Sequence, residues 1–407
     1  MTKLKMNENQ NQFTGRNMVL GVQFLFVAFG ATVLVPLLVG IDPAVALFTA
    51  GIGTLIFHLI TKGMVPVFLG SSFAFIAPII EATRLYGLPG ALSGIVAVGI
   101  VYTVVSALVK WRGIKLIERL FPATVVGPVI MIIGLSLAGT AIDMAKTHWP
   151  IAVISLATAV IVVVFTKGLI KLIPIFIGIV VGYIAGLVFG VIDFTPIKEA
   201  AWLQLPGFIV PEFNWNAILY MIPVAVAPII EHVGDMYAIG GVAEKNFIEK
   251  PGLHRTLLGD GIATGLAGMV GGVPNTTYSE VTGAIALTKV TNPFILRIAA
   301  ITAIVFSLIG KVSGILKTIP QAVLGGIMLL LFGLIASVGI KTLIDSKTDL
   351  SQIRNQVVVS IVLTIGIGGA VISWGNFSLA GIGLAAVVGI LLNLILPGES
   401  KKVNVEG

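Results

Sequence analysis

The sequence contains no cysteine and very little charge. Only 11% of its 407 residues are charged, whereas 57% are hydrophobic. The absence of cysteine excludes disulfides, thiol catalysis and cysteine-ligated metals. The four histidines (His58, His148, His232 and His254) are too widely spaced in the sequence to predict a metal cluster. We therefore expect no metal, cofactor or redox chemistry.

Apolar segments long enough to cross a lipid bilayer recur along the whole chain. With Gly, Pro and charged residues taken as boundaries, the hydropathy predicts about fourteen spans and an all-α polytopic membrane protein. The predicted spans are residues 17–39, 43–61, 66–81, 90–109, 122–140, 149–166, 172–192, 215–240, 256–272, 274–289, 293–310, 320–339, 355–373 and 379–397. Residues 1–16 are polar and have no small-residue cleavage site, so they are predicted to be a cytoplasmic tail and not a signal peptide. Residues 398–407 form the second predicted tail.

The distribution of positive charge favours an even number of spans with both termini in the cytoplasm. Cytoplasmic loops of membrane proteins carry an excess of Lys and Arg. In this orientation all but five of the 25 Lys and Arg residues fall on the cytoplasmic side. The five exceptions are Arg84, Lys146, Lys198, Lys311 and Lys317. The net charge of +7 therefore reflects membrane orientation and does not indicate nucleic-acid binding.

Two pairs of segments indicate an internal repeat. Residues 122–127 (PATVVG) recur as residues 320–325 (PQAVLG), and residues 70–73 (GSSF) resemble residues 275–278 (NTTY). Seven predicted spans separate the members of each pair. An odd number of spans per repeat inverts the second copy relative to the first, as in many secondary transporters. The predicted repeats are residues 17–200 and 201–397.

Spans three and ten are the irregular members of this repeat. Both combine Gly, Pro, Ser, Thr and aromatic residues at membrane depth, so they are predicted to contain short extended segments. Backbone N–H groups freed in such segments can bind a polar substrate. The alternative is that Gly and Pro merely allow kinks and close packing of helices.

Acidic residues within apolar spans are the main functional signal. Glu231 and Asp235 lie in span eight and Glu280 in span ten, where an ionised carboxylate is costly and by default marks a transport pathway. Asp235 follows Glu231 by one helical turn, so the two acids can share a proton. Alternatively, these acids and His232 form a buried structural polar network. His232 is turned about 100° from Glu231 around the helix, so it is predicted to face a neighbouring helix and not the substrate. Asp260, near the start of span nine, is interpreted as an interfacial structural residue.

The same residues argue against three other classes of membrane protein. A channel requires a continuous polar pore, whereas the acids are few and lie at one depth. An enzyme requires a nucleophile with a base, or a metal site, and no such constellation is evident. Several acids at one site would repel the substrate of an anion transporter. We therefore expect a proton-coupled secondary transporter and no enzymatic activity.

Several motifs give the chain a resemblance to a known family. They are FGATVLVPLLVGIDPA in span one, FLGSSFAFIAP in span three, EHVGD in span eight, KPGLHRTLLGDGIATGLAGMVGGVPNTTYSE through spans nine and ten, and KTLIDSK at residues 341–347. With these motifs the chain resembles the nucleobase-ascorbate transporter family, also called nucleobase:cation symporters-2, and within it the bacterial uracil permeases. The resemblance implies a core domain from spans 1–4 and 8–11 and a gate domain from spans 5–7 and 12–14. It also implies proton-coupled import of uracil across the bacterial cytoplasmic membrane, commonly by a homodimer.

The resemblance also implies a substrate site. By position, Glu231 and Glu280 match the two acids that hold the nucleobase, and Phe73 matches the residue beside the ring. Ser72, Tyr278 and Ser279 match neighbouring residues of the two irregular segments. Uracil offers two ring N–H donors and two carbonyl acceptors. Carboxylates can accept from the donors, the four backbone amides near the segments can donate to the carbonyls, and Phe73 or Tyr278 can stack on the ring.

Three departures from the uracil permease pattern leave the substrate open. Asp235 stands where these permeases often have His, and Asp is associated with the purine-transporting relatives. Val281 replaces an Asn of the family signature, and Phe332 replaces a Tyr. Xanthine presents the same donor and acceptor edge as uracil. The alternative prediction is therefore a symporter for xanthine, uric acid or a broader set of purines and pyrimidines.

Overall fold

The computed structural model describes residues 13–114, 121–168, 170–374 and 377–397. Most of both predicted tails, residues 1–12 and 398–407, lies outside the described residues. The first half contains α1 (Gly15–Val39), α2 (Pro43–Ile60), β1 (Leu69–Ser71), η1 (Phe73–Phe75), α3 (Ile76–Arg112), α5 (Ala123–Leu135), α6 (Ala138–Lys146), α7 (Trp149–Phe165), α8 (Pro174–Val188) and α9 (Thr195–Glu199). The second half contains α10 (Trp215–Met221), η3 (Ile222–Ala225), α11 (Val226–Ala243), α12 (Leu253–Met269), β2 (Asn275–Thr277), α13 (Ser279–Thr288), α14 (Pro293–Ser307), α15 (Gly310–Lys317), α16 (Gln321–Asp345), α17 (Ile353–Ile367), β3 (Val371–Trp374), β4 (Phe377–Ala380) and α18 (Gly381–Ile395).

The helix boundaries follow ordinary capping rules. The Asp42 side chain accepts a hydrogen bond from the Ala44 N–H at the start of α2, and Pro43 occupies the first turn, where its missing N–H has no cost. Asn292 and Pro293 begin α14 in the same way. α1 ends at Gly40, which adopts a left-handed conformation (φ 76°) that glycine tolerates best. Local sequence therefore determines where these spans begin and end.

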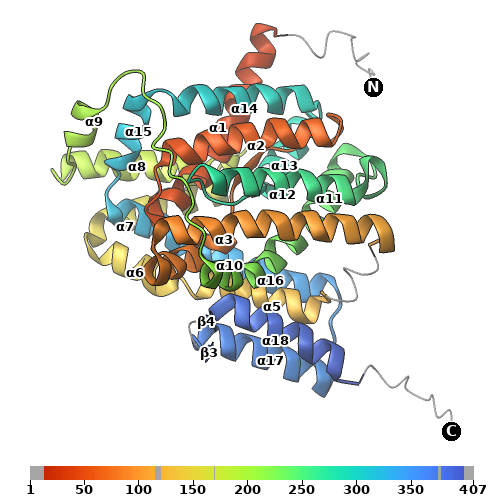
Figure 1. Ribbon diagram of the computed structural model, residues 1–407. Coiled ribbons are helices and arrows are strands. Elements are labelled where there is room, and N and C mark those ends of the chain that lie inside the picture. Colours follow the sequence, from red (N-terminus) through yellow and green to blue (C-terminus); the bar gives the residue numbers. More distant parts are fainter. Residues whose placement is uncertain (1–12, 115–120, 169, 375–376, 398–407) are drawn as a thin grey trace.

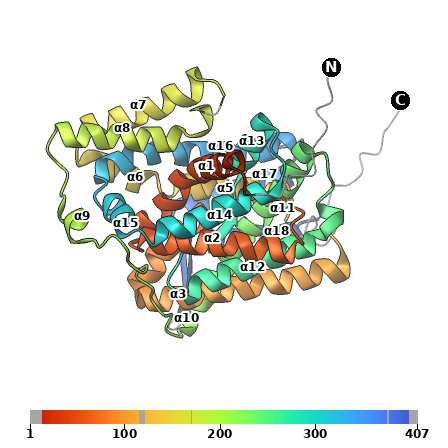
Figure 2. The same cartoon turned by 90° about the horizontal axis from the view of Figure 1, so that it is seen from above.

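The helices run roughly parallel or antiparallel to one another (Figure 1). In the described residues, six helical stretches are long and apolar enough to cross a membrane, and five shorter helices are also apolar. α3 packs against α12 and α10, and α2 packs against α14 and α12. A second group is built on α16, which contacts α5, α6, α7 and α8. α7 and α8 form one edge of the molecule seen from above (Figure 2), and α17 packs beside α18 at another edge.

The two irregular segments pair with each other in the interior of the protein. β1 and β2 pair antiparallel, with Gly70 opposite Thr276 and Ser71 opposite Asn275. All six strand residues are buried, and the strands lead directly into η1 and α13. This pairing confirms the predicted extended segments in spans three and ten. It satisfies part of the backbone hydrogen bonding that a helix would otherwise provide at membrane depth.

Four predicted spans differ in detail from the structure. Spans three and four are joined in α3, which is interrupted by Gly87 (φ 74°, ψ 160°). Span eight is divided into α10, η3 and α11 around Pro223, which cannot donate a backbone hydrogen bond. The end of span thirteen was predicted as helix, but residues 371–374 form β3, which pairs with β4 as a hairpin. Gly369 (φ 65°) ends the helical stretch there, and Val371 and Ile372 favour strand.

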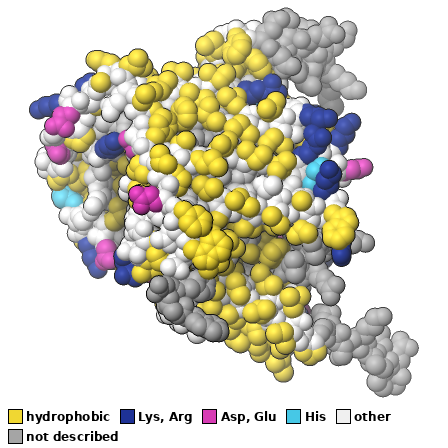
Figure 3. Space-filling view, in the orientation of Figure 1, with side chains coloured by type: hydrophobic (Ala, Val, Ile, Leu, Met, Phe, Trp, Pro, Cys, Tyr) yellow, Lys and Arg dark blue, Asp and Glu magenta, His cyan; other side chains and the backbone are white. Residues whose placement is uncertain are grey.

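The surface has the apolar belt expected of a membrane protein. Figure 3 shows hydrophobic side chains over most of the middle of the visible face, with Lys and Arg concentrated toward its two ends. Exposed large apolar residues are numerous on the helices, including Val104, Leu108, Val153 and Ile161. Contiguous apolar surface of this extent is unusual for a water-soluble protein. The chain is a multi-pass membrane protein.

Candidate functional site

The crossing of β1 and β2 places two helix N-termini close together. η1 begins at Phe73, one residue after β1, and continues into α3, and α13 begins at Ser279, one residue after β2. The first N–H groups of a helix have no acceptor within the helix, and the helix dipole gives this end a partial positive charge. One of the predicted donors is already used, because the Ser72 N–H donates to the Pro274 carbonyl (2.9 Å). Donation to a substrate carbonyl is therefore left to the remaining amides.

The two aromatic residues of the predicted site differ in their surroundings. Tyr278 is buried, its hydroxyl donates to the Ser71 carbonyl (2.9 Å), and its ring packs on Gly70, where any side chain would collide with it. Tyr278 thus holds the two crossed segments together. Phe73 is only half-buried, so its ring has surface on which a flat molecule can stack.

The two predicted substrate acids lie on accessible surface beside the crossing. Glu231 on α11 and Ser279 at the start of α13 are exposed, and Glu280 is half-buried. Glu231 lies close enough to Glu280 for their charges to interact. The neighbouring His232, Thr277 and Tyr278 are buried. The accessible surface of this region is therefore formed by the carboxylates of Glu231 and Glu280 and by the first residue of α13.

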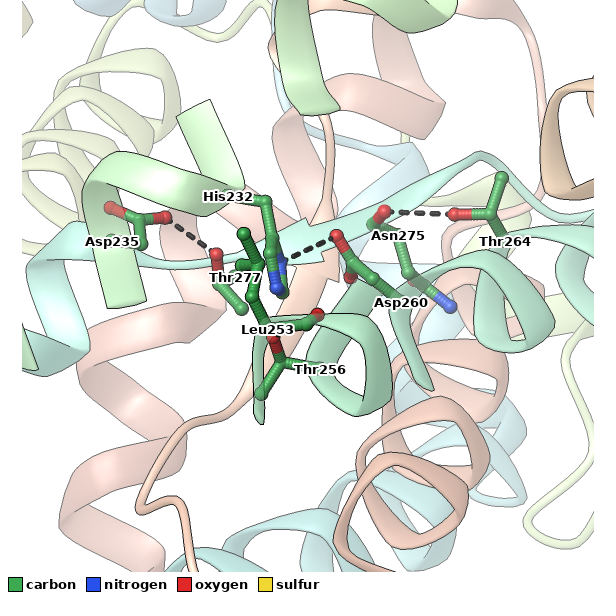
Figure 4. Close-up of polar contacts among 8 residues, drawn as sticks. All are labelled: His232, Asp235, Leu253, Thr256, Asp260, Thr264, Asn275 and Thr277. Carbon is green, nitrogen blue, oxygen red and sulfur yellow. Dashed lines mark hydrogen bonds and ion pairs between the residues drawn. The ribbon is translucent and has the colours of Figure 1, made fainter. Parts of the chain in front are cut away.

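Asp235 is held by the second crossed strand. It is 8% exposed, and its Oδ2 accepts a hydrogen bond from the Thr277 hydroxyl (2.6 Å), as Figure 4 shows. A bond this short to a carboxylate is typical of a charge-assisted interaction. Asp235 also lies within electrostatic range of Glu231 and Glu280. The structure thus brings the predicted proton-sharing acids into one cluster and attaches that cluster to β2.

The sequence interpretation of Asp260 was wrong. Asp260 is fully buried on α12, and its Oδ2 lies 3.1 Å from Nδ1 of His232, which is also fully buried (Figure 4). The helix begins at Leu253, so Asp260 lies two turns inside it, with its side chain in the protein interior. An acid flanked by Gly259 and Gly261 in an apolar helix was the available signal. The prediction that His232 faces a neighbouring helix is correct.

A helix of the second helical group lies next to this site. α5 contacts both η1 and α11, and α16 packs along α5. Phe332 on α16 is buried among apolar side chains, as expected for a residue without a hydroxyl. Among the described residues, no group of three or more His, Asp or Glu side chains could hold a metal ion.

The fold assigns the chain to a structural class of membrane proteins. It is similar to the transmembrane domain of a cyanobacterial bicarbonate transporter, BicA (TM-score 0.65, 17% identity, 94% of this chain and 98% of that chain), and to the murine Solute Carrier 26 family member A9 anion transporter (TM-score 0.67, 10% identity, 97% and 69%). These structures have two inverted repeats of seven spans, which confirms the predicted fold class. The chain therefore has the inverted-repeat fold of two times seven spans.

Sequence comparison identifies the family. A model of the permease family, Xan_ur_permease, matches residues 15–374. The chain is 51% identical over 403 residues to a probable uracil permease of Haemophilus influenzae (97% of each chain) and 44% identical over 415 residues to a uracil permease of Bacillus caldolyticus (98% and 96%). The chain belongs to this permease family, the nucleobase-ascorbate transporters, as the motifs predicted. Membership confirms a transporter and not an enzyme.

Proposed function

We propose that this protein imports uracil across the bacterial cytoplasmic membrane together with protons. The observation that carries the proposal is the pair of acids Glu231 and Glu280, which lie within electrostatic range of each other beside the crossed strands and are both accessible. Relatives that are 41–52% identical are named uracil permeases, which supports the same substrate class.

The donors and acceptors of the site match a neutral nucleobase. Glu231 and Glu280 each accept a ring N–H, and the free amides at the start of η1 and α13 donate to the carbonyl oxygens. Phe73 supplies an apolar surface for the ring. A molecule without these donors leaves both carboxylates unpaired, which costs about 1–3 kcal/mol for each buried group and more for a charged one. Selectivity against apolar and anionic molecules follows.

Proton coupling follows from the number of acids. Glu231, Asp235 and Glu280 cannot all be ionised without strong repulsion in a region of low dielectric constant. Proton binding at this cluster and substrate binding therefore favour each other, because a proton lowers the repulsion between the acids that the substrate bridges. Movement of the core domain (spans 1–4 and 8–11) against the gate domain (spans 5–7 and 12–14) then carries both to the cytoplasm. We expect both termini in the cytoplasm and a homodimer.

Uptake into proteoliposomes tests the proposal. Labelled uracil is supplied under an inward proton gradient, with and without a protonophore, and with excess unlabelled xanthine in a parallel sample. Accumulation that the protonophore abolishes and xanthine does not reduce is expected. Uptake of xanthine without uptake of uracil would replace the substrate and make Asp235 the residue to examine. Accumulation unaffected by the protonophore would exclude proton coupling.

A further inference from the structure

His232 and Asp260 form a polar pair that substrate binding does not explain. Both side chains are 0% exposed, and Nδ1 of His232 lies 3.1 Å from Oδ2 of Asp260. The outer atoms of the pair, Nε2 of His232 and Oδ1 of Asp260, have no hydrogen-bond partner among the described residues. Nearly all buried polar atoms in folded proteins have a partner. A pair with two open polar atoms is a poor structural link, because apolar residues would connect α11 and α12 without the desolvation cost.

The chemistry of this pair is that of a proton acceptor. When Nδ1–H of the neutral imidazole donates to the Asp260 carboxylate, the lone pair of Nε2 remains free. A proton that binds Nε2 gives an imidazolium ion, and the adjacent carboxylate stabilises its charge. Release of that proton from Nε2 restores the neutral imidazole. No other bond changes in this step, so it needs no further reactant.

The groups around the pair make its charge relevant to the substrate site. The titratable side chains that interact electrostatically with Asp260 are Tyr102 on α3 and Glu231 and Asp235 on α11, and Glu280 on α13 interacts in turn with Glu231 and Asp235. From α2 it meets the ring of Phe57, whose centroid lies 6.3 Å from that of His232. Among these described groups His232 is the one basic side chain, and it lies with three carboxylates, those of Asp260, Glu231 and Asp235. With Nε2 unprotonated, Asp260 adds a negative charge that Glu231 experiences; with Nε2 protonated, the pair is neutral.

We propose that the His232–Asp260 pair is a second proton-binding site of the transporter, which takes up and releases one proton on His232 Nε2 in each transport cycle. This proposal rests on the proposed function, because the proton is exchanged with the substrate acids. His232 directly follows Glu231 on α11, and Asp235 fixes the next turn of the same helix to Thr277. A change of charge at the pair therefore acts on the exchange of a proton with Glu231 and not on the position of that acid.

Two amide substitutions separate proton binding from a structural role. Asp260→Asn keeps an oxygen that accepts from Nδ1–H but removes the negative charge that stabilises the imidazolium. His232→Asn keeps an N–H donor at the place of Nδ1 but removes Nε2. His148→Asn is the control, since His148 caps α7 far along the chain from this cluster and Asn is a good capping residue.

The readouts are uracil binding in detergent, uracil exchange across proteoliposomes without a proton gradient, and gradient-driven accumulation from pH 5.5 to 8.5. We expect the uracil affinity and the exchange rate of both variants to lie within about threefold of the wild-type values. A threefold change is smaller than the tenfold change that corresponds to one pKa unit. Accumulation should fall at least about tenfold, and its pH dependence should flatten, because one titrating group is lost. The control should match the wild type.

The outcomes that overturn this inference differ from those that overturn the function. If Asp260→Asn and His232→Asn accumulate uracil with the wild-type pH profile, the pair is structural. If a folded variant loses binding and exchange as well, the pair shapes the substrate site and is not a separate proton site. Gel filtration identifies a variant that fails to fold, and the other variant then decides. A wild type that does not bind uracil overturns the proposed substrate alone, and the same comparison is made with xanthine.

Discussion

The two repeats use the same backbone device with different side chains. In each repeat a short strand leads into a half-helix, and the strands pair across the centre of the molecule. The position of Glu280 in the second repeat corresponds to Phe75 in the first, at the offset that relates residues 70–73 to residues 275–278, and Phe75 is buried. Glu231, Asp235 and Asp260 also belong to the second repeat. The backbone crossing is therefore symmetric, but its side chains are not. The second repeat supplies the acids, and the first repeat supplies the apolar Phe75 at the position that corresponds to Glu280.

The largest expected effect comes from neutralising the acids of the second repeat. Glu231→Gln and Glu280→Gln each replace a carboxylate acceptor by an amide that presents a donor to the substrate N–H. We expect uracil uptake to fall about a hundredfold in each, as for the loss of a charged hydrogen bond in a closed site. Initial rates in proteoliposomes and equilibrium binding measure this loss.

Glu81→Gln is the matched control from the first repeat. Glu81 is also an acid on a half-helix, α3, but its carboxylate is paired with Arg84 (2.6 Å) and partly exposed. Uptake by this variant should stay within about twofold of the wild type, because exposed ion pairs contribute little. A loss in Glu81→Gln as large as that in the other two variants would mean that uptake does not depend specifically on the acids beside the crossing.

A smaller effect is expected at the strand that holds Asp235. Thr277→Val removes the hydroxyl that donates to Asp235, so uptake should fall about tenfold and its pH dependence should shift. Thr276→Val changes the neighbouring residue of β2, whose hydroxyl has no partner among the described residues, and should leave uptake within about twofold. Uptake rates of the two variants across pH 5.5 to 8.5 make the comparison. Equal behaviour would show that the Thr277 contact does not matter.

The sequence predicts the scaffold better than it predicts the use of each polar group. Spans, the internal repeat and the extended segments could be predicted because bilayer thickness and the cost of free backbone groups act locally. The acids Glu231, Asp235 and Glu280 stand out for the same reason. The hairpin of β3 and β4 was missed because its apolar residues match a strand and a helix end equally well by hydropathy.

Long-range contacts explain what the sequence did not predict. The Ser72 amide looked available to a substrate, but the antiparallel register directs it to Pro274. The Tyr278 hydroxyl is used by Ser71 for the same reason. Asp260 was assigned to the interface because its depth depends on where α12 begins and on its packing against α3. No local pattern encodes these contacts.

Another contact between the repeats, α5 against α16, depends on glycine. A Cβ added at Gly339 would lie 2.5 Å from the Gly127 carbonyl oxygen, whereas one added at Gly333 on the same helix would meet nothing within 4 Å. Gly339→Ala should therefore destabilise the protein by about 1–3 kcal/mol through overpacking. Gly333→Ala should be neutral or stabilise it by up to about 1 kcal/mol through helix propensity. Thermal unfolding in detergent measures both, and equal midpoints would show that the helices can move apart without cost.

The smallest effect is expected for an ion pair between an acid of the first repeat and a base of the second repeat. Asp42, in the connection between α1 and α2, accepts from Lys317 (2.8 Å) and from Ser313 (3.0 Å) on α15. Burial acts to raise the pKa of Asp42, but the hydrogen bonds and charge of Lys317 with those of Ala44 and Ser313 together hold the pKa below its usual value of 3.8. The stabilisation is thus fully present above about pH 4 and is lost as pH falls through the lower folded-state pKa.

Lys317→Met tests this pair, and Lys146→Met provides the comparison. Both partners of the Asp42 pair are partly exposed, so its loss should cost only about 1 kcal/mol or less. The Lys146–Asp143 pair is more exposed, and its loss should leave the unfolding midpoint unchanged. The difference between Lys317→Met and the wild type should vanish once the pH falls well below the lowered folded-state pKa of Asp42, at a pH where Asp42 is protonated in both proteins. A difference that persists at this pH would mean that Lys317 acts through packing, and that only the acids at membrane depth respond to protons.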